Sequence, residues 1–244
     1  MNESELKTST KQRVMIGIIA GLMLISTIAV YALIVLNGNN SNKKEQDAEA
    51  TLAEYEEKLT AMDEELASSD EKYSKKFYNT LSKYRSQVKS FNATTANNAG
   101  LKKEDLVKGT GAEIKEDEVY SVYYIGWCAD ESVFDSSFDN WEKPSALKRP
   151  FIGTYKAESN STIQGWRDGI VGMKAGGIRK LEIPGELAYG ENSTVCNAEN
   201  SPLKYIVYAI DTDEDYKKKV TEYNELYSEY QYTAMMYYYS QSSN

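Results

Sequence analysis

The chain has 244 residues, with 37 Asp and Glu against 28 Lys and Arg, two Cys and no His. Without His it lacks the commonest metal ligand and the commonest general base near neutral pH, and its two distant Cys form no zinc or CxxC motif. The formal charge of −9 argues against nucleic acid as a partner, since phosphate binding needs clustered Lys and Arg. We therefore expect no metal, no cofactor and no nucleic acid partner.

An uncharged segment dominates the N-terminal part of the chain. Residues 14–36, "VMIGIIAGLMLISTIAVYALIVL", are long enough to cross a ~30 Å hydrocarbon core as a helix. Lys7, Lys11 and Arg13 precede it, which favours a cytoplasmic tail at 1–13 and places the rest of the chain outside. A cleaved signal peptide is the alternative, but the apolar run continues past the poor cleavage site at 30–32. We predict a single-pass cell-membrane protein with a transmembrane helix at 14–36 and a linker at 37–44.

A second helix is predicted at 45–92, which contains no Pro or Gly. Its apolar residues recur mostly at 3–4 spacing with one stutter, typical of a heptad seam. Two interpretations stay open: a coiled coil, or an amphipathic helix docked on its own domain. The small polar residues at 93–100 predict a linker and a domain boundary.

The central part of the chain combines strands with one short helix. Residues 118–128, 178–184 and 203–211 are rich in β-branched and aromatic residues and predict strands. Ile163, Trp166, Ile170 and Met173 follow a helical 3–4–3 spacing. One short helix among several strands predicts an α+β domain.

A third helix is predicted at 213–244, with a Tyr-rich heptad seam. It lacks a second apolar face and so needs one partner. Within the 45–92 helix, residues 45–71 are acidic apart from Lys58, whereas 72–91 carry only basic charges. We expect the C-terminal helix to pair within its own chain against the basic half, with Glu222, Glu225 and Glu229 facing Lys75, Lys83 or Lys89.

Five motifs occur in an order that resembles the FKBP family of peptidyl-prolyl isomerases: "DLVKGTG" at 105–111, "VYYIG" at 122–126, "FDSS" at 134–137, "IQGWRDGIVGMKAGGIRKLEIPGELAYGEN" at 163–192 and "PLKYIVYAID" at 202–211. The resemblance covers residues 101–212. It implies an FKBP-like curved antiparallel β-sheet wrapped on a short helix, here flanked by the long N- and C-terminal helices and the transmembrane helix.

The resemblance also implies a site for proline-containing protein substrates. Trp166 is the expected floor of an apolar pocket, Tyr124, Phe134 and Tyr189 are its walls, and Asp135 is the polar group near the substrate amide. Ile163 is expected to offer its backbone N–H to a substrate carbonyl, and Tyr205 stands where the family usually has Phe. The aromatic position near Phe151 falls to either Phe151 or Ile152.

The rim of this pocket departs from the family pattern. Thr162 makes one wall more polar, and "STVCNAENS" at 193–201 replaces an apolar loop. We expect these changes to affect substrate preference, and affinity for the macrolide ligands that the resemblance implies, more than catalysis. The sequence predicts a membrane-anchored, extracytoplasmic folding catalyst; the alternative is a non-catalytic binding, scaffold or chaperone module.

The implied topology also brings Cys128, at the end of one strand, near Cys196, in the loop before the last strand. A disulfide between them is therefore one expectation. The alternative, which the sequence favours, is two unpaired thiols, one packed and one exposed.

Overall fold

The computed structural model describes residues 41–116, 118–154, 162–191 and 195–242. The chain divides into two compact units: Met62–Glu222, and a smaller unit from Met1–Ala61 with Tyr223–Asn244. The predicted tail 1–13, the predicted transmembrane helix 14–36 and the first half of the predicted linker 37–44 lie outside the described residues. Within the described ranges, no helix is both long enough and apolar enough to cross a bilayer.

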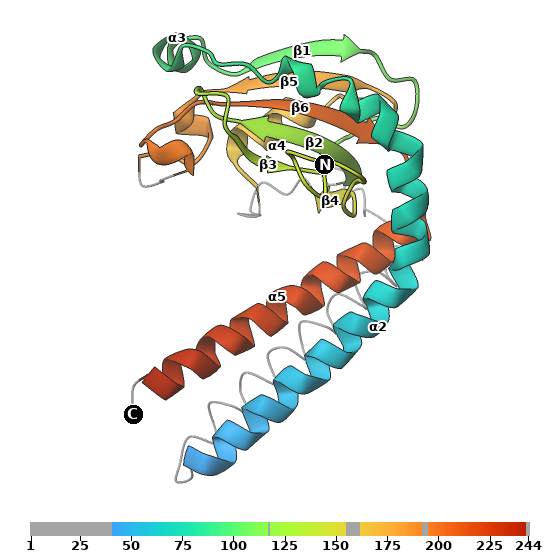
Figure 1. Cartoon of the computed structure of the whole chain (residues 1–244), viewed down its shortest axis with the longest axis vertical. Helices are drawn as coiled ribbons and strands as arrows, with labels where there is room; N and C mark the ends of the chain where they lie inside the picture. Colours follow the sequence, from blue (N-terminus) through green and yellow to red (C-terminus); the bar gives the residue numbers. More distant parts are fainter. Residues whose placement is uncertain (1–40, 117, 155–161, 192–194, 243–244) are drawn as a thin grey trace, which may run out of the picture. The chain divides into compact units, whose positions relative to one another are not determined.

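One antiparallel sheet organises the larger unit (Figure 1). Its strand order is β1-β5-β6-β2-β3, and β4 pairs with β2 as well. The strands are β1 Lys102–Val107, β2 Val119–Trp127, β3 Val133–Ser136, β4 Phe151–Thr154, β5 Ile178–Ile183 and β6 Leu203–Ile210. The predictions at 118–128, 178–184 and 203–211 correspond to β2, β5 and β6. The α+β class and the antiparallel sheet are thus confirmed.

Side-chain alternation along β2 gives the sheet two buried faces. Tyr120 and Val122 belong to the core that also contains Trp166 and Ile170 of helix α4, Gln164–Ile170. Tyr123, which points to the opposite face, contacts a different helix. A strand buried on both sides explains why the sequence at 118–128 is apolar almost throughout.

The opposite face is covered by the second half of helix α2, Ser41–Ser82. Tyr73, Phe77 and Leu81 are buried, and Phe77 meets the Tyr208 ring edge-on at 5.4 Å and the Tyr123 ring at 6.0 Å. For residues 62–82, the docked amphipathic helix is therefore the correct interpretation of the 3–4 pattern.

The bounds of α2 differ from the predicted 45–92. The helix begins four residues earlier, inside the predicted linker, and ends at Ser82. Beyond it, the short helix η1, Arg85–Gln87, leads to backbone contacts with the sheet: the Lys89 carbonyl accepts from Trp127 Nε1 at 3.1 Å, and the Phe91 N–H donates to the Ala129 carbonyl at 2.9 Å. These tertiary contacts replace the helical hydrogen bonds that the periodicity predicts.

The predicted linker 93–100 contains a further helix, α3 Ala93–Asn98. The Asn92 side chain caps its N-terminus by accepting from the Thr95 N–H at 2.8 Å. Small polar residues thus mark a capped helix here as well as a boundary.

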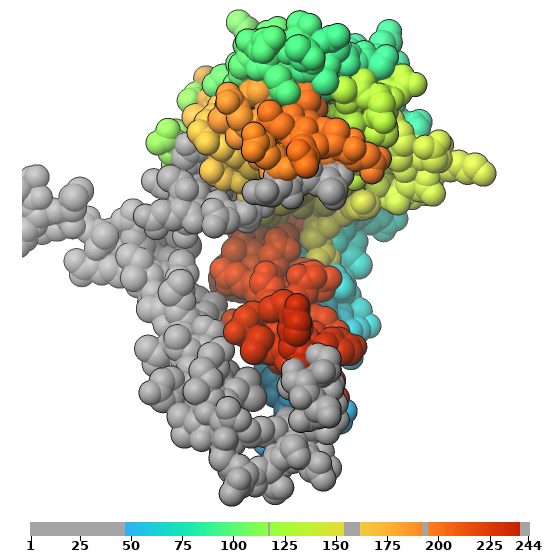
Figure 2. Space-filling model, turned by 90° about the vertical axis from the view of Figure 1, so that its left-hand side faces the viewer, coloured from blue at the N-terminus to red at the C-terminus, as the bar shows by residue number. Residues whose placement is uncertain are grey.

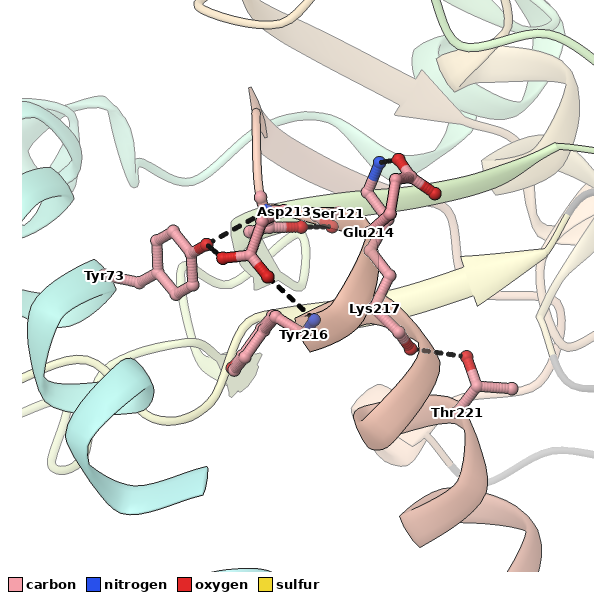
Figure 3. Close-up of polar contacts among 8 residues, drawn as sticks. Tyr73, Ser121, Asp213, Glu214, Tyr216, Lys217 and Thr221 are labelled. Carbon is pink, nitrogen blue, oxygen red and sulfur yellow. Dashed lines mark hydrogen bonds and ion pairs between the residues drawn. The ribbon is translucent and has the colours of Figure 1, made fainter. Parts of the chain in front are cut away.

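Helix α5, Glu214–Ser242, begins directly after the sheet, and Figure 2 shows its residues in red at the surface. Asp213 caps it, since one carboxylate oxygen accepts from the Tyr216 N–H at 2.8 Å (Figure 3). The other oxygen accepts from the Tyr73 hydroxyl of α2 at 2.7 Å. One residue therefore starts α5 and ties it to α2.

Helices α2 and α5 pair within one chain, but the prediction that α5 lies against the basic half of residues 45–92 is wrong. In the larger unit, Lys219 pairs with Glu65 at 2.7 Å and the Tyr216 hydroxyl bonds Asp70. The basic half meets α5 only at its start, where the Tyr73 ring lies 4.8 Å from that of Tyr216, because Phe77 further along already covers the sheet.

A disulfide joins Cys128 to Cys196, so the expectation of two unpaired thiols is wrong. The cysteines are 68 residues apart in sequence, yet their Cα atoms lie 5.6 Å apart. Antiparallel pairing brings them together, because Trp127 at the end of β2 stands opposite Lys204 at the start of β6. The bridge fixes the short helix η3, Val195–Asn197, to the sheet.

Candidate active site

Close helix packing puts Trp166 under the concave face of the sheet. Its neighbour Gly165 leaves no room for a side chain, because a Cβ there would stand 2.3 Å from Ile183 Cγ2. Helix α4 thus approaches β5 more closely than any larger residue would permit. The Trp166 side chain is 4% exposed.

A hydrogen bond holds the Trp166 ring from below. Its Nε1–H donates to the Tyr120 hydroxyl at 3.0 Å. Burial, as the largest cause, raises the pKa of Tyr120 to about 12. Sequence reasoning missed Tyr120, although its position four residues before Tyr124 on one strand places both on the same face.

Three aromatic rings surround Trp166 in edge-to-face contacts. The Tyr205 ring lies 5.1 Å from it, the Tyr124 ring 5.3 Å and the Phe151 ring 6.1 Å. Phe151, rather than Ile152, therefore takes the aromatic position that the sequence left open. Such contacts hold each ring in one orientation and leave apolar edges facing the enclosed space.

These rings enclose a cavity of about 140 Å³. Its lining consists of Tyr124, Asp135, Phe151, Thr162, Ile163, Trp166, Tyr189 and Tyr205. Six of the seven predicted site residues line it. Phe134 does not; its ring packs edge-on behind Tyr205 at 5.6 Å and supports that wall.

Two hydrogen bonds order the polar groups at the cavity. The Tyr124 hydroxyl donates to Asp135 Oδ2 at 2.5 Å, and the hydroxyls of Tyr205 and Tyr189 bond each other. Burial, followed by the bond to Asp135, raises the pKa of Tyr124. Burial raises the pKa of Tyr205 well above its usual 10. The pocket tyrosines are therefore neutral near pH 7.

The edge of the cavity retains polar groups for a ligand. No hydrogen bond among the described residues uses the Ile163 N–H, which begins α4 as its N-cap. The Thr162 hydroxyl is buried and has no partner in the described part of the chain. An N–H and a hydroxyl at the rim of an apolar space suit a peptide carbonyl.

The loop before β6 is held at two points beside this rim. One is the disulfide at Cys196. The other is Asn97 of α3, whose side chain donates to the Asn200 carbonyl at 3.1 Å and accepts from the Gly185 N–H at 2.8 Å. The disulfide and the Asn97 hydrogen bonds thus hold in place a loop that has few apolar residues to pack. The sequence did not indicate this role of Asn97.

A second depression, of about 230 Å³, lies between β1 and the turn after α4. Its buried Arg179 pairs with Asp105 at 2.6 Å and donates to the Gly169 carbonyl at 2.8 Å. This arginine is internally satisfied and serves packing.

Comparisons with known proteins place the cavity in context. A family model described as FKBP-type peptidyl-prolyl cis-trans isomerase matches residues 111–210. An "FK506-binding protein" of Neisseria meningitidis serogroup B is 40% identical over 91 residues, 37% of this chain and 75% of that protein. "FK506-binding protein 4" of Dictyostelium discoideum is 39% identical over 94 residues, 38% of this chain but only 23% of that protein.

Two further similarities give weaker evidence. The solved structure titled "Crystal structure of AtFKBP13" is 29% identical, with a TM-score of 0.36, covering 48% of this chain and 96% of that one. A model described as "Vesicle transport v-SNARE protein N-terminus" matches residues 27–98, which contain all of α2. Neither adds to the assignment of the site.

Proposed function

We propose that this chain, which belongs to the FKBP-type peptidyl-prolyl cis-trans isomerase family, accelerates X–Pro rotation in unfolded or partly folded proteins while anchored to a membrane. The observation that carries the site assignment is the cavity around Trp166. Its aromatic walls and its rim N–H and hydroxyl form a space with the character that a prolyl ring and its amide require.

The physical chemistry of the reaction fits such a cavity. Rotation about a peptide bond faces a barrier of ~18–20 kcal/mol, because the planar amide has partial double-bond character. The twisted amide has less charge separation than the planar one, so a surrounding with little water favours it. Lowering the barrier by about 5 kcal/mol would accelerate rotation a few thousand-fold, and no nucleophile is needed.

The membrane attachment rests on the sequence. Residues 14–36 supply the proposed transmembrane helix, and the basic residues before it put the isomerase domain on the extracytoplasmic side. The Cys128–Cys196 bridge supports this placement, because disulfides persist in oxidising compartments.

A non-catalytic binding module is the second candidate, favoured by the polar, cross-linked rim loop. A peptide held there in one isomer would bind without turnover. We also propose that the same cavity binds macrolides. The polar rim is the feature that argues most against tight macrolide binding.

Isomerisation of a short X–Pro peptide, followed by NMR exchange between its cis and trans signals, separates the two candidates. The sample is the full chain in detergent, since α2 is part of the folded unit. We expect acceleration that Trp166→Ala largely abolishes and Asp135→Ala reduces more modestly. Trp141→Ala, at a half-buried tryptophan outside the cavity lining, is the control and should leave the rate unchanged. Peptide binding without any acceleration by the unaltered chain would favour the binding module.

A further inference from the structure

The C-terminal part of α5 differs in composition from the rest of the helix. Residues 230–242, "YQYTAMMYYYSQS", contain no charged residue, whereas charged residues are frequent from 214 to 229. Five large side chains in this stretch are exposed: Tyr232, Met235, Met236, Tyr238 and Tyr239, with Tyr238 at 70%. We call these five residues the tip cluster.

Hydrogen bonds fix the position of this stretch along α2. The Tyr230 hydroxyl donates to Glu56 at 2.9 Å and the Tyr237 hydroxyl to Glu49 at 2.8 Å. Both steps are seven residues in opposite chain directions, so the helices are antiparallel in the smaller unit, and the tip cluster lies beside the first turns of α2. From Glu49, the start of α2 at Ser41 is about 12 Å away along the axis.

The helix pair buries little at this end. Among residues 47–61 and 223–239, only Leu59 is buried. Paired helices in water are stabilised mainly by burial of an apolar face. Five large side chains are exposed beside a helix–helix interface that buries so little, which indicates that another surface covers them.

The sequence indicates what that surface is. The apolar run 14–36 ends five residues before Ser41, so the proposed anchor brings the first turns of α2, and the tip cluster beside them, to the lipid surface. Tyrosine is enriched at membrane interfaces, where its ring contacts acyl chains and its hydroxyl meets water and headgroups. A stretch without charges enters this layer without the cost of desolvating an ion.

We infer that the tip cluster lies in the headgroup layer and gives the chain a second membrane contact beside its anchor. This inference rests on the proposed membrane anchoring. Residues 41–57 carry six acidic residues and two basic ones, Lys43 and Lys44, so their net charge is negative and the preferred surface is zwitterionic rather than anionic.

The test uses the full chain reconstituted in phosphatidylcholine vesicles. Cys128 and Cys196 are bridged, so a fluorophore reacts with a single introduced thiol in the absence of reductant. Tyr238→Cys labels the tip cluster. Tyr227→Cys is the matched control: it is also an exposed tyrosine, and it lies three turns earlier on the same side of α5, about 16 Å along the axis.

We expect lipids carrying a nitroxide near the headgroup to quench most of the emission at position 238 and little at 227. Aqueous iodide should show the reverse order, and vesicles rich in anionic lipid should weaken the quenching by lipid. Flotation of the unlabelled chain with the vesicles is measured on the same preparation.

The outcomes distinguish a failure of this inference from a failure of the proposed membrane anchoring. Chains that do not float overturn the anchor and the inference together. Chains that float but show equal iodide quenching at 238 and 227 overturn the inference alone. Self-quenching at 238 that disappears on dilution with unlabelled chain, without quenching by lipid, identifies a second copy as the covering layer and also overturns it.

Discussion

Two neighbouring tyrosines on β2 provide a direct test of how the pocket floor is held. Tyr120 and Tyr123 are 3% and 0% exposed. The Tyr120 hydroxyl accepts the Trp166 Nε1–H at 3.0 Å, whereas the Tyr123 hydroxyl, on the other face of the sheet, has no hydrogen-bond partner among the described residues. Replacement by Phe removes one oxygen atom at either position and changes nothing else in shape.

The expected energies differ in size and in sign. Tyr120→Phe leaves the buried indole N–H without an acceptor, which costs about 1–3 kcal/mol of unfolding free energy. Tyr123→Phe removes a buried hydroxyl that already lacks a partner, so the unfolding free energy should stay the same or rise. The gap between the two variants is therefore expected to exceed about 1 kcal/mol.

Urea unfolding of the full chain, followed by tryptophan fluorescence, measures this difference. The three tryptophans, Trp127, Trp141 and Trp166, all belong to the unit Met62–Glu222, so the signal reports that unit. Equal unfolding free energies for the two variants would refute the reasoning, because the hydrogen bond to Trp166 would then contribute nothing. A Tyr120→Phe variant with normal stability but slower isomerisation would show that the bond orients the indole ring without stabilising the fold.

Three further outcomes are expected. Tyr205→Phe removes the partner of the Tyr189 hydroxyl, so the KM for X–Pro peptides should change several-fold while the fold persists; unchanged kinetics would show that this bond does not order the rim. Burial keeps the pKa of Tyr205 in the folded chain well above 10, the value at which it ionises when unfolded, so the unfolding free energy of the unaltered chain should fall as pH rises past 10. Tyr205→Phe should make this fall with pH less steep by up to about 1.4 kcal/mol per pH unit. Parallel plots of unfolding free energy against pH for the two chains would contradict the assignment. The double variant Cys128→Ser/Cys196→Ser opens a loop of 68 residues and should lose about 4 kcal/mol of unfolding free energy; intact mass after alkylation without reductant should show no free thiol in the unaltered chain, and two alkylated cysteines would disprove the bridge.

The sequence was sufficient for elements whose pattern has a single physical solution. The run at 118–128 is both β-branched and aromatic, and it forms β2 within one residue at each end. Likewise, the ordered motifs located six of the residues that line the cavity. Their individual roles in catalysis stay predictions until the variants are measured.

The remaining features depend on which helix face packs on which part of the sheet, and no local sequence pattern contains that information. The heptad pattern at 45–92 continues to Phe91, but tertiary hydrogen bonds at Lys89 and Phe91 end the helix at Ser82. The acidic and basic halves suggested a charge-matched helix pair, yet burial of Phe77 against the sheet outweighs exposed charge pairs, which contribute little in water. The disulfide, too, followed from strand pairing and not from cysteine spacing.

The position of Phe77 has a consequence for how this protein can be divided. The family motifs end at the edges of the sheet, and a fragment cut there would keep every residue of the cavity. It would also lose α2 and expose the face that carries Tyr123 and Tyr208, both of which Phe77 now covers. An open apolar sheet face promotes association between copies. The segment that folds is therefore longer than the segment that holds the cavity, and truncation at the motif boundaries is expected to yield aggregates whose inactivity says nothing about the chemistry of the site.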